Sequence, residues 1–164
     1  VNLRFYVRYK DSGIWKRGVV FIKEFVPKPV LSFVANSLYN EHYETLPMRH
    51  SWNTIGDELQ VDYQWKKNKV WNSLSVTAEK NAIPIAAESE AEFITEHYWG
   101  YAMQTRGGTV EHPRWNVYPT KSYSINVDFL KSYGPDFAFL KMQPPASVFL
   151  AEGSEIKVQS ARKL

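Results

Sequence analysis

Short runs of alternating polar and apolar residues, separated by turn-forming residues, constrain the fold of this chain more than any other feature. Residues 3–10 and 16–25 alternate in this way on either side of Asp11, Ser12 and Gly13, which predicts a β-hairpin. Aromatic residues, which favour pleated and half-buried strands, make up 15% of the chain. Further runs predict a long antiparallel sheet with a meander over residues 42–52, 58–66 and 69–78.

The first predicted helix begins at Pro29, because a proline is tolerated in the first turn of a helix. Val30, Val34 and Leu38 then recur at a spacing of four, which places them on one helical face. Asn40 can end the helix in a left-handed conformation. We interpret the apolar stripe as a face that packs against the sheet.

Two shorter helices are predicted from their ends. Ser89 and Glu92 match the capping-box pattern, in which each side chain satisfies a free amide at the helix start, so residues 90–96 should be helical. A third helix is expected after Asn126, ending at Gly134. The chain is 164 residues long and has no linker composition, so we expect a single domain over residues 1–164.

The amino-acid composition excludes several kinds of site and partner. The chain has no cysteine, which excludes disulfides, thiolate nucleophiles and thiolate metal ligands. Its net charge of +3 comes from short basic clusters beside turns, which we interpret as solvated loops, so no nucleic-acid partner is expected. No apolar run approaches the roughly 20 residues of a membrane span, so a cytoplasmic protein without membrane contact is predicted. Because the chain begins at Val1 within a predicted strand, we also expect a preceding N-terminal segment.

The stretch TEHYWGY, residues 95–101, holds the densest group of reactive side chains. Residues 97–105 should pair with residues 109–117 through a turn at 106–108. With that turn, odd positions of the first strand share a face with even positions of the second. The residues predicted on this face are Trp99, Tyr101, Met103, His112 and Arg114.

A metal ion shared by His97 and His112 would need both imidazoles within ~2 Å of the ion. In the predicted register the two histidines are about 13 Å apart along the ladder, at ~3.3 Å per residue. Glu111 lies on the opposite face from His112, so the Glu-His pairs do not form a ligand set. No metal site and no cofactor are therefore predicted.

Two further stretches place polar groups among aromatic ones. Arg4 and Tyr6 share one face of the first predicted strand, opposite Phe5 and Val7, and this face is either solvated or the wall of a pocket. The sequence lacks the nucleophile elbow, the phosphate loop and the dinucleotide fingerprint that mark several enzyme classes. The second stretch follows the first helix and contributes His42, Glu44 and Arg49.

The order of motifs resembles the uncharacterised YqjF-like family, a domain-of-unknown-function group placed with the acetoacetate decarboxylase-like fold. The resemblance runs through NLRFYVR, RGVVF, FITEHYWGY, VEHPRW and SVFLAEGSEIKVQ, and so over essentially the whole chain. It implies a β-rich (α+β) fold, in which a curved antiparallel sheet closes toward a cone or barrel around an apolar cavity. Two or three peripheral helices would lie outside this sheet.

The chain departs from the related decarboxylases at one decisive place. Those enzymes form a Schiff base through a lysine whose position corresponds to residues 41–47 here, and this chain has no lysine from residue 29 to residue 65. We therefore expect no decarboxylation by that route. Near the start of the chain, Arg4 is the side chain that could bind an anionic group.

Three functions remain open. The leading hypothesis is a protein that binds a small, largely apolar molecule bearing a carboxylate, held by Arg4 with Arg49 or Arg114. The second is a lysine-independent acid-base enzyme acting on a keto acid or lactone, with Glu44, Glu96, His97 or His112 as proton carriers. The third is a protein interaction module whose exposed Trp99 and Tyr101 favour a homodimer. The candidate ligand-binding residues are Arg4, Tyr6, His42, Glu44, Arg49, Trp99, Tyr101, His112 and Arg114.

Overall fold

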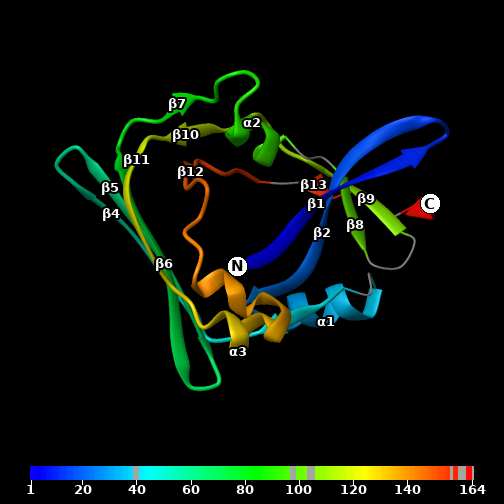
Figure 1. Cartoon of the computed structure of the whole chain (residues 1–164), viewed down its shortest axis with the longest axis horizontal. Coiled ribbons are helices and arrows are strands. Elements are labelled where there is room, and N and C mark those ends of the chain that lie inside the picture. Colours follow the sequence, from blue (N-terminus) through cyan, green and yellow to red (C-terminus); the bar gives the residue numbers. More distant parts are fainter. Residues whose placement is uncertain (39–40, 97–98, 103–105, 156, 159–161, 164) are drawn as a thin grey trace. The chain divides into compact units, whose positions relative to one another are not determined.

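The computed structural model describes residues 1–38, 41–96, 99–102, 106–155, 157–158 and 162–163 (Figure 1). This part of the chain is β-rich, as predicted, and its strands form three sheets where a single long sheet was expected. The chain divides into two compact units. Unit 1 comprises residues 1–45, 86–114 and 154–164, and unit 2 comprises residues 46–85 and 115–153. The prediction of a single domain stays a prediction.

Unit 1 is built on a long hairpin of β1 (Asn2–Asp11) and β2 (Ile14–Val26), the blue strands of Figure 1. Its two-residue turn consists of Ser12 and Gly13, which have φ angles of 49° and 87°. Positive φ at both turn positions matches the right-handed twist of the flanking strands, and glycine adopts it without steric cost. The predicted hairpin is confirmed.

The rest of this sheet is mixed, which corrects the prediction of an antiparallel sheet. Strands β3 (Tyr43–Thr45) and β8 (Trp99–Ala102) both pair with β2 in parallel. Strand β9 (Arg106–Glu111) pairs with β8, and the short strands β13 (Lys157–Val158) and β14 (Arg162–Lys163) pair with β9. Parallel neighbours require a crossover connection, and α1 (Pro29–Leu38) supplies it between β2 and β3.

Helix α1 confirms the helix predicted from Pro29, but its apolar stripe does not pack as expected. Val30 is 70% exposed and Val34 is 38% exposed. The polar side chains make the contacts instead: the Ser32 hydroxyl bonds that of Thr45 at 2.7 Å. Polar anchoring therefore fixes this helix, and the predicted end at Asn40 lies outside the described residues.

Helix α2 (Glu90–Thr95) confirms the second predicted helix. The Ser89 hydroxyl accepts a hydrogen bond from the backbone N–H of Glu92 at 3.2 Å. The Glu92 carboxylate accepts from the backbone N–H of Glu88 at 2.7 Å, one residue earlier than a standard capping box requires. The local sequence was sufficient to predict this helix start.

Unit 2 contains an antiparallel sheet of β4 (Met48–Ile55), β5 (Glu58–Lys67), β6 (Val70–Glu79) and β11 (Thr120–Asn126). The strand predicted over residues 42–52 is two strands, β3 and β4, which belong to different sheets and are separated by Leu46 and Pro47. A proline cannot donate to a ladder, so it separates strands readily. Asn68 and Lys69, with φ angles of 47° and 66°, form the β5–β6 turn.

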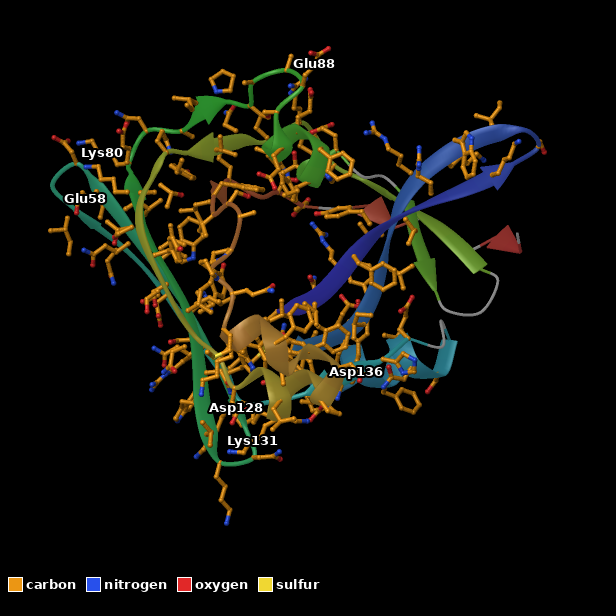
Figure 2. The ribbon with its side chains drawn as sticks, viewed as in Figure 1. Glu58, Lys80, Glu88, Asp128, Lys131 and Asp136 are labelled. Atoms are coloured by element: carbon orange, nitrogen blue, oxygen red, sulfur yellow. The ribbon has the colours of Figure 1, made fainter. Side chains whose placement is uncertain are left out.

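A smaller sheet in unit 2 joins β7 (Ile83–Pro84), β10 (Asn116–Tyr118) and β12 (Leu150–Ala151). The third predicted helix is confirmed as α3 (Phe129–Tyr133), and the 3₁₀ helix η1 (Pro135–Lys141) follows it. Figure 2 labels Asp128 and Lys131 at the start of α3, where the Asp128 carboxylate accepts from the Lys131 backbone N–H at 3.0 Å. A φ of 100° at Gly134 separates α3 from η1.

Among the side chains that the structure describes, the buried apolar ones are concentrated in unit 2. Among the described side chains nine hydrophobic residues are buried, and seven of them belong to unit 2. Asn72, 1% exposed, is part of this core: its Oδ1 accepts from the backbone N–H of Asp128 at 2.8 Å and its Nδ2 donates to the carbonyl of Val70 at 3.3 Å. A buried amide with such partners is stabilising where an unpartnered one would be costly.

Two expectations about the whole fold remain. Within the described residues the sheets have open edges, so the predicted closure into a barrel is not found there. The acetoacetate decarboxylase-like fold accordingly stays a prediction. In the described part of the chain, no helix combines the length and apolar character needed to cross a membrane.

Candidate functional site

The predicted aromatic hairpin is confirmed as β8 and β9, but its register differs from the expected one. Trp99 pairs with Thr109 and Tyr101 with Gly107, so odd positions lie opposite odd positions. Gly107 and Gly108 lie within β9, and the predicted turn at 106–108 is wrong. A local pattern fixed the hairpin but not its register, because arginine and glycine are tolerated in both a strand and a turn.

This register removes the argument that separated His97 from His112. His112 follows the end of β9, and His97 lies outside the described residues, so the exclusion of a shared metal stays a prediction. Among the described residues no group of three or more potential ligands could hold a metal ion. The side chains of Trp99 and Tyr101 are also outside the description, so the hypothesis of a protein interaction module stays a prediction.

Three of the predicted site residues have structural partners in unit 1. The Arg114 guanidinium pairs with the Glu92 carboxylate at 2.6 Å, and therefore helps to hold the start of α2. Nδ1 of His112 lies 2.8 Å from the carbonyl oxygen of Pro113. Glu44 forms an ion pair with Lys23 at 3.3 Å, which brings a lysine to the segment where the sequence itself has none.

Arg49 belongs to unit 2, apart from the other candidates in the division of the chain. Its Nε donates to Oε1 of Gln64 at 2.6 Å, and its guanidinium lies 4.3 Å from the ring centre of Trp71. Gln64 is on the adjacent strand β5, and Trp71 is on β6, the next strand of the same sheet. The geometry gives Arg49 a role in the outer surface of that sheet.

The face of β1 that carries Arg4 and Tyr6 contacts α2. The Tyr6 ring packs on Phe93 with 5.1 Å between ring centres, and Nη2 of Arg4 donates to the Tyr6 hydroxyl at 3.5 Å. Arg17 of β2 lies over the other aromatic partner, 5.5 Å from the centre of the Phe93 ring. This face is therefore an aromatic and cationic surface, half-buried at Tyr6.

Next to this face lies a group of titratable side chains that we call the Glu24 cluster: Arg4, Glu24, Glu41 and Tyr43. Strand β2 pairs with β1 on one side and β3 on the other, so Glu24 lies opposite both Asn2 and Tyr43. Residues directly opposite each other project from the same face of a sheet. The Glu24 carboxyl group and the Tyr43 hydroxyl are accordingly hydrogen-bonded.

The backbone around the cluster is held by three further hydrogen bonds. The carbonyl of His42 accepts from the backbone N–H of Glu24 at 3.2 Å. From α1, Nδ2 of Asn36 donates to the Tyr43 carbonyl at 2.9 Å, while the Tyr43 backbone N–H donates to Oδ1 of Asn36 at 2.8 Å. Helix α1 therefore positions Tyr43 against Glu24, and the side chain of His42 is exposed.

The cluster has an unusual electrostatic character. Burial raises the pKa of Glu24 to about 7; its hydrogen bond with Tyr43 opposes this shift, Glu41 adds to it, and Arg4 lowers the pKa slightly. Burial also raises the pKa of Glu41, and burial together with the Glu24 charge raises the pKa of Tyr43 well above its usual range. A carboxyl group with a pKa near neutral can both donate and accept a proton under physiological conditions.

Glu24 was not among the residues proposed from the sequence. It follows Lys23 in the strand segment FIKEFV, and an alternating strand normally exposes such a charged residue to solvent. Its environment depends on the parallel pairing of β2 with β3 and on Glu41, 17 positions later in the chain. The available signal was one acidic residue in a strand whose other charged residues are basic, and it indicated no partner.

Comparison with known protein families assigns the chain to one of them. A family model described as an uncharacterized conserved protein, DUF2071, matches residues 1–155. The chain belongs to the DUF2071 family. No curated protein and no solved structure matches it. Membership of DUF2071 agrees with the uncharacterised family that the sequence resembles, and it assigns no reaction or ligand.

Proposed function

We propose that this DUF2071 protein binds a small, largely apolar molecule with a carboxylate group, and that the Glu24 cluster receives the carboxylate. The observation that carries the proposal is the convergence of Arg4, Glu24 and Tyr43 on one face of the mixed sheet. A guanidinium group and a phenol are both hydrogen-bond donors toward a carboxylate. The cluster thus combines donors with a carboxyl group of adjustable charge.

The apolar part of the ligand would lie against the aromatic side chains next to Arg4. Tyr6 and Phe93 pack against each other there, and Arg17 covers Phe93. Binding sites for small molecules commonly combine aromatic walls with a few polar groups that fix orientation. The proposal assigns this wall to Tyr6 and Phe93 and the anionic contact to Arg4.

A panel of phenylacetate, benzoate and hexanoate tests the proposal by thermal shift and by isothermal titration calorimetry. We expect at least one carboxylate to raise the melting temperature in a concentration-dependent manner. Arg4→Ala should weaken its binding by about tenfold or more, since a hydrogen bond to a charged group contributes roughly 1.5–3 kcal/mol.

Arg8→Ala is the matched control, because Arg8 lies on the same strand and its guanidinium stacks 5.5 Å from the Trp15 ring centre. It should leave the affinity unchanged. If no carboxylate binds, or if Arg4→Ala and Arg8→Ala have equal effects, Arg4 is not the anchor and the proposal fails.

A second function is an acid-base enzyme that needs no lysine. The pKa of about 7 at Glu24 favours it, because a general acid or base works best when its pKa lies near the operating pH. The substrate would then be a small keto acid or lactone. Glu24→Gln should abolish turnover of such compounds, whereas His112→Ala should preserve it. The opposite pattern would identify His112 as the proton carrier.

A further inference from the structure

The end of the β1–β2 hairpin, residues 8–17, exposes two large apolar side chains. Among the described strands, β8 and β3 pair with β2 only from Val19 onward, so this end of the hairpin has no third strand beside it (Figure 1). Ile14 is 69% exposed and Trp15 is 59% exposed. Exposed side chains of this size next to each other at the end of a hairpin are available for contact with a partner.

Three cationic side chains share one face of this hairpin end with Trp15. The register places Lys10 opposite Trp15. It also places Arg8 opposite Arg17, two positions further from the turn and therefore on the same face. The Arg8 guanidinium lies 5.5 Å from the centre of the Trp15 ring, and the Lys10 ammonium group lies 5.8 Å from it. The aromatic ring is thus bordered by positive charge.

This positive charge is not paired with acidic groups in the described part of the chain. Arg8, Lys10 and Arg17 form no ion pair with any side chain that the structure describes. Like charges directly opposite each other, such as Arg8 and Arg17, destabilise a sheet. Residues 8–17 have a formal net charge of +3, from four basic residues and one acidic residue, Asp11. An anionic partner would relieve the repulsion.

We propose that the end of the β1–β2 hairpin binds the surface of a membrane that contains anionic lipids. Trp15 and Ile14 enter the boundary between headgroups and acyl chains, where tryptophan is enriched and apolar side chains are removed from water. Arg8, Lys10 and Arg17 contact the lipid phosphates, because basic side chains are attracted to an anionic leaflet. This contact is independent of the proposed binding of a carboxylate.

The apolar side chains favour a membrane over a nucleic acid. A single-stranded nucleic acid would stack a base on Trp15 and place phosphates near the basic groups, but it would leave Ile14 in water. Ile14 and Trp15 project from opposite faces of the strand, so a hairpin that enters a bilayer turn first brings both into it. The sequence-based prediction of no membrane contact rested on the lack of a spanning segment, which surface binding does not need.

Cosedimentation of the 164-residue chain with lipid vesicles tests the proposal. Vesicles of phosphatidylcholine with about 30% phosphatidylserine should bind the chain at least about tenfold more tightly than vesicles of phosphatidylcholine alone, because several basic residues gain from an anionic surface. Raising the salt concentration from about 0.1 M to about 0.5 M should weaken binding to the anionic vesicles, since salt screens exposed charges.

Two double variants separate the contributions of charge and apolar contact. Arg8→Gln with Lys10→Gln should weaken binding to the phosphatidylserine vesicles by about tenfold or more, and Ile14→Ser with Trp15→Ser by a similar factor. All four side chains are exposed, so circular dichroism and the melting temperature should stay close to those of the unmodified protein. Trp15→Phe adds a second measurement: brominated lipid should quench less of its tryptophan emission than that of the unmodified protein.

The β5–β6 turn provides the matched control, because it combines the same charge with a tryptophan. Residues 66–71 contain three lysines and no acidic residue, which also gives a formal net charge of +3. Trp71 is only 38% exposed, and the Arg49 guanidinium lies 4.3 Å from its ring centre. Lys66→Gln with Lys69→Gln should therefore change vesicle binding by no more than about twofold.

Selective binding to the phosphatidylserine vesicles, weakened by both hairpin variants and not by the control variant, would support the proposal. Three results would overturn it: no binding to either kind of vesicle, equal binding to both kinds, or equal losses in the hairpin and control variants. Binding of a single-stranded oligodeoxythymidylate without binding of vesicles would also overturn it, because the hairpin end would then be a nucleic-acid surface.

Discussion

The two units bury different kinds of side chain. Unit 2 holds seven of the nine buried hydrophobic residues among the described side chains, and its buried amide, Asn72, is hydrogen-bonded to three backbone groups. Among its described side chains unit 1 buries Val19, Phe25 and the polar Thr95, and the members of the Glu24 cluster are half-buried. Apolar burial is the larger source of stability, whereas a buried carboxyl group is costly in its ionised form.

The two units also differ in what their polar side chains do. In unit 2 the polar groups of the core serve the fold, since Asn72 connects β6 to the start of α3. In unit 1, burial raises the pKa of Glu24 to about 7 and also raises the pKa of Glu41. Among its described residues, unit 2 has one strongly shifted group, Tyr133, whose pKa burial alone raises to about 12, whereas the shifts of Glu24 and Glu41 occur together, and groups of shifted carboxyls are typical of functional sites.

The largest expected effect tests the core of unit 2. Trp65 is 1% exposed, so Trp65→Ala should lower the free energy of unfolding by about 3–5 kcal/mol, through lost burial and the cavity that it leaves. Trp52→Ala is the matched control, because Trp52 is 42% exposed on the neighbouring strand, and it should cost well under half as much. Urea denaturation followed by circular dichroism measures both. Equal losses would contradict the assignment of this core.

An intermediate effect tests the Glu24 cluster through stability. Glu24 holds its proton more tightly in the folded protein, with a pKa of about 7 against the ordinary 4.5. Its stabilising contribution is thus complete below pH 4.5 and is lost as the pH rises through 7. After allowance for solvent screening, Glu24→Gln should be more stable than the unmodified protein at pH 8 by roughly 1–2 kcal/mol.

Denaturation midpoints of the Glu24→Gln variant at pH 5 and pH 8 provide the measurement. The advantage of the variant should shrink as the pH falls toward 5, because Glu24 then becomes neutral in the folded protein as well. Glu58→Gln, at a half-buried glutamate of unit 2 that pairs with Lys121 at 3.1 Å, serves as the control, with no such trend expected. A Glu24→Gln variant that is equally destabilised at both pH values would show that the carboxyl group is structural.

The smallest effect tests local structure in unit 1. Ser89→Ala removes the hydroxyl that accepts from the Glu92 backbone N–H at 3.2 Å, and should cost about 1 kcal/mol. Ser37→Ala, at an exposed serine of α1, should change stability by only a few tenths of that. Thermal denaturation of both variants gives the comparison, and equal effects would mean that the cap contributes nothing measurable to stability.

Local features were predictable because their causes lie within a few residues. Ser12 and Gly13 supply the turn of the first hairpin, and Ser89 supplies the cap of α2. Alternation predicted β1, β2, β5 and β6, since side chains on a strand alternate between its faces whatever lies beside it. These elements follow from backbone sterics and hydrogen bonding over short distances.

The candidate site was only partly predictable. Arg4 and Tyr6 were identified because they share one face of a strand, and the structure adds Phe93 as the partner of Tyr6. Glu24 was missed, and Arg49 and Arg114 are engaged with Gln64 and Glu92 respectively. A single sequence indicates which residues share a face of one strand, but not which strand comes next to it.

The β-rich class, three helices, the first hairpin and the absence of any thiol chemistry could be predicted from the amino-acid sequence. The three-dimensional structure was needed to show that β2 pairs in parallel with β3 and β8, that Pro47 lies between strands of two sheets, and that Tyr43 and Glu41 act on Glu24. The physical reason is that pairing between distant strands depends on burial and register across the whole sheet. The pKa of a side chain depends in turn on the neighbours which that pairing brings to it.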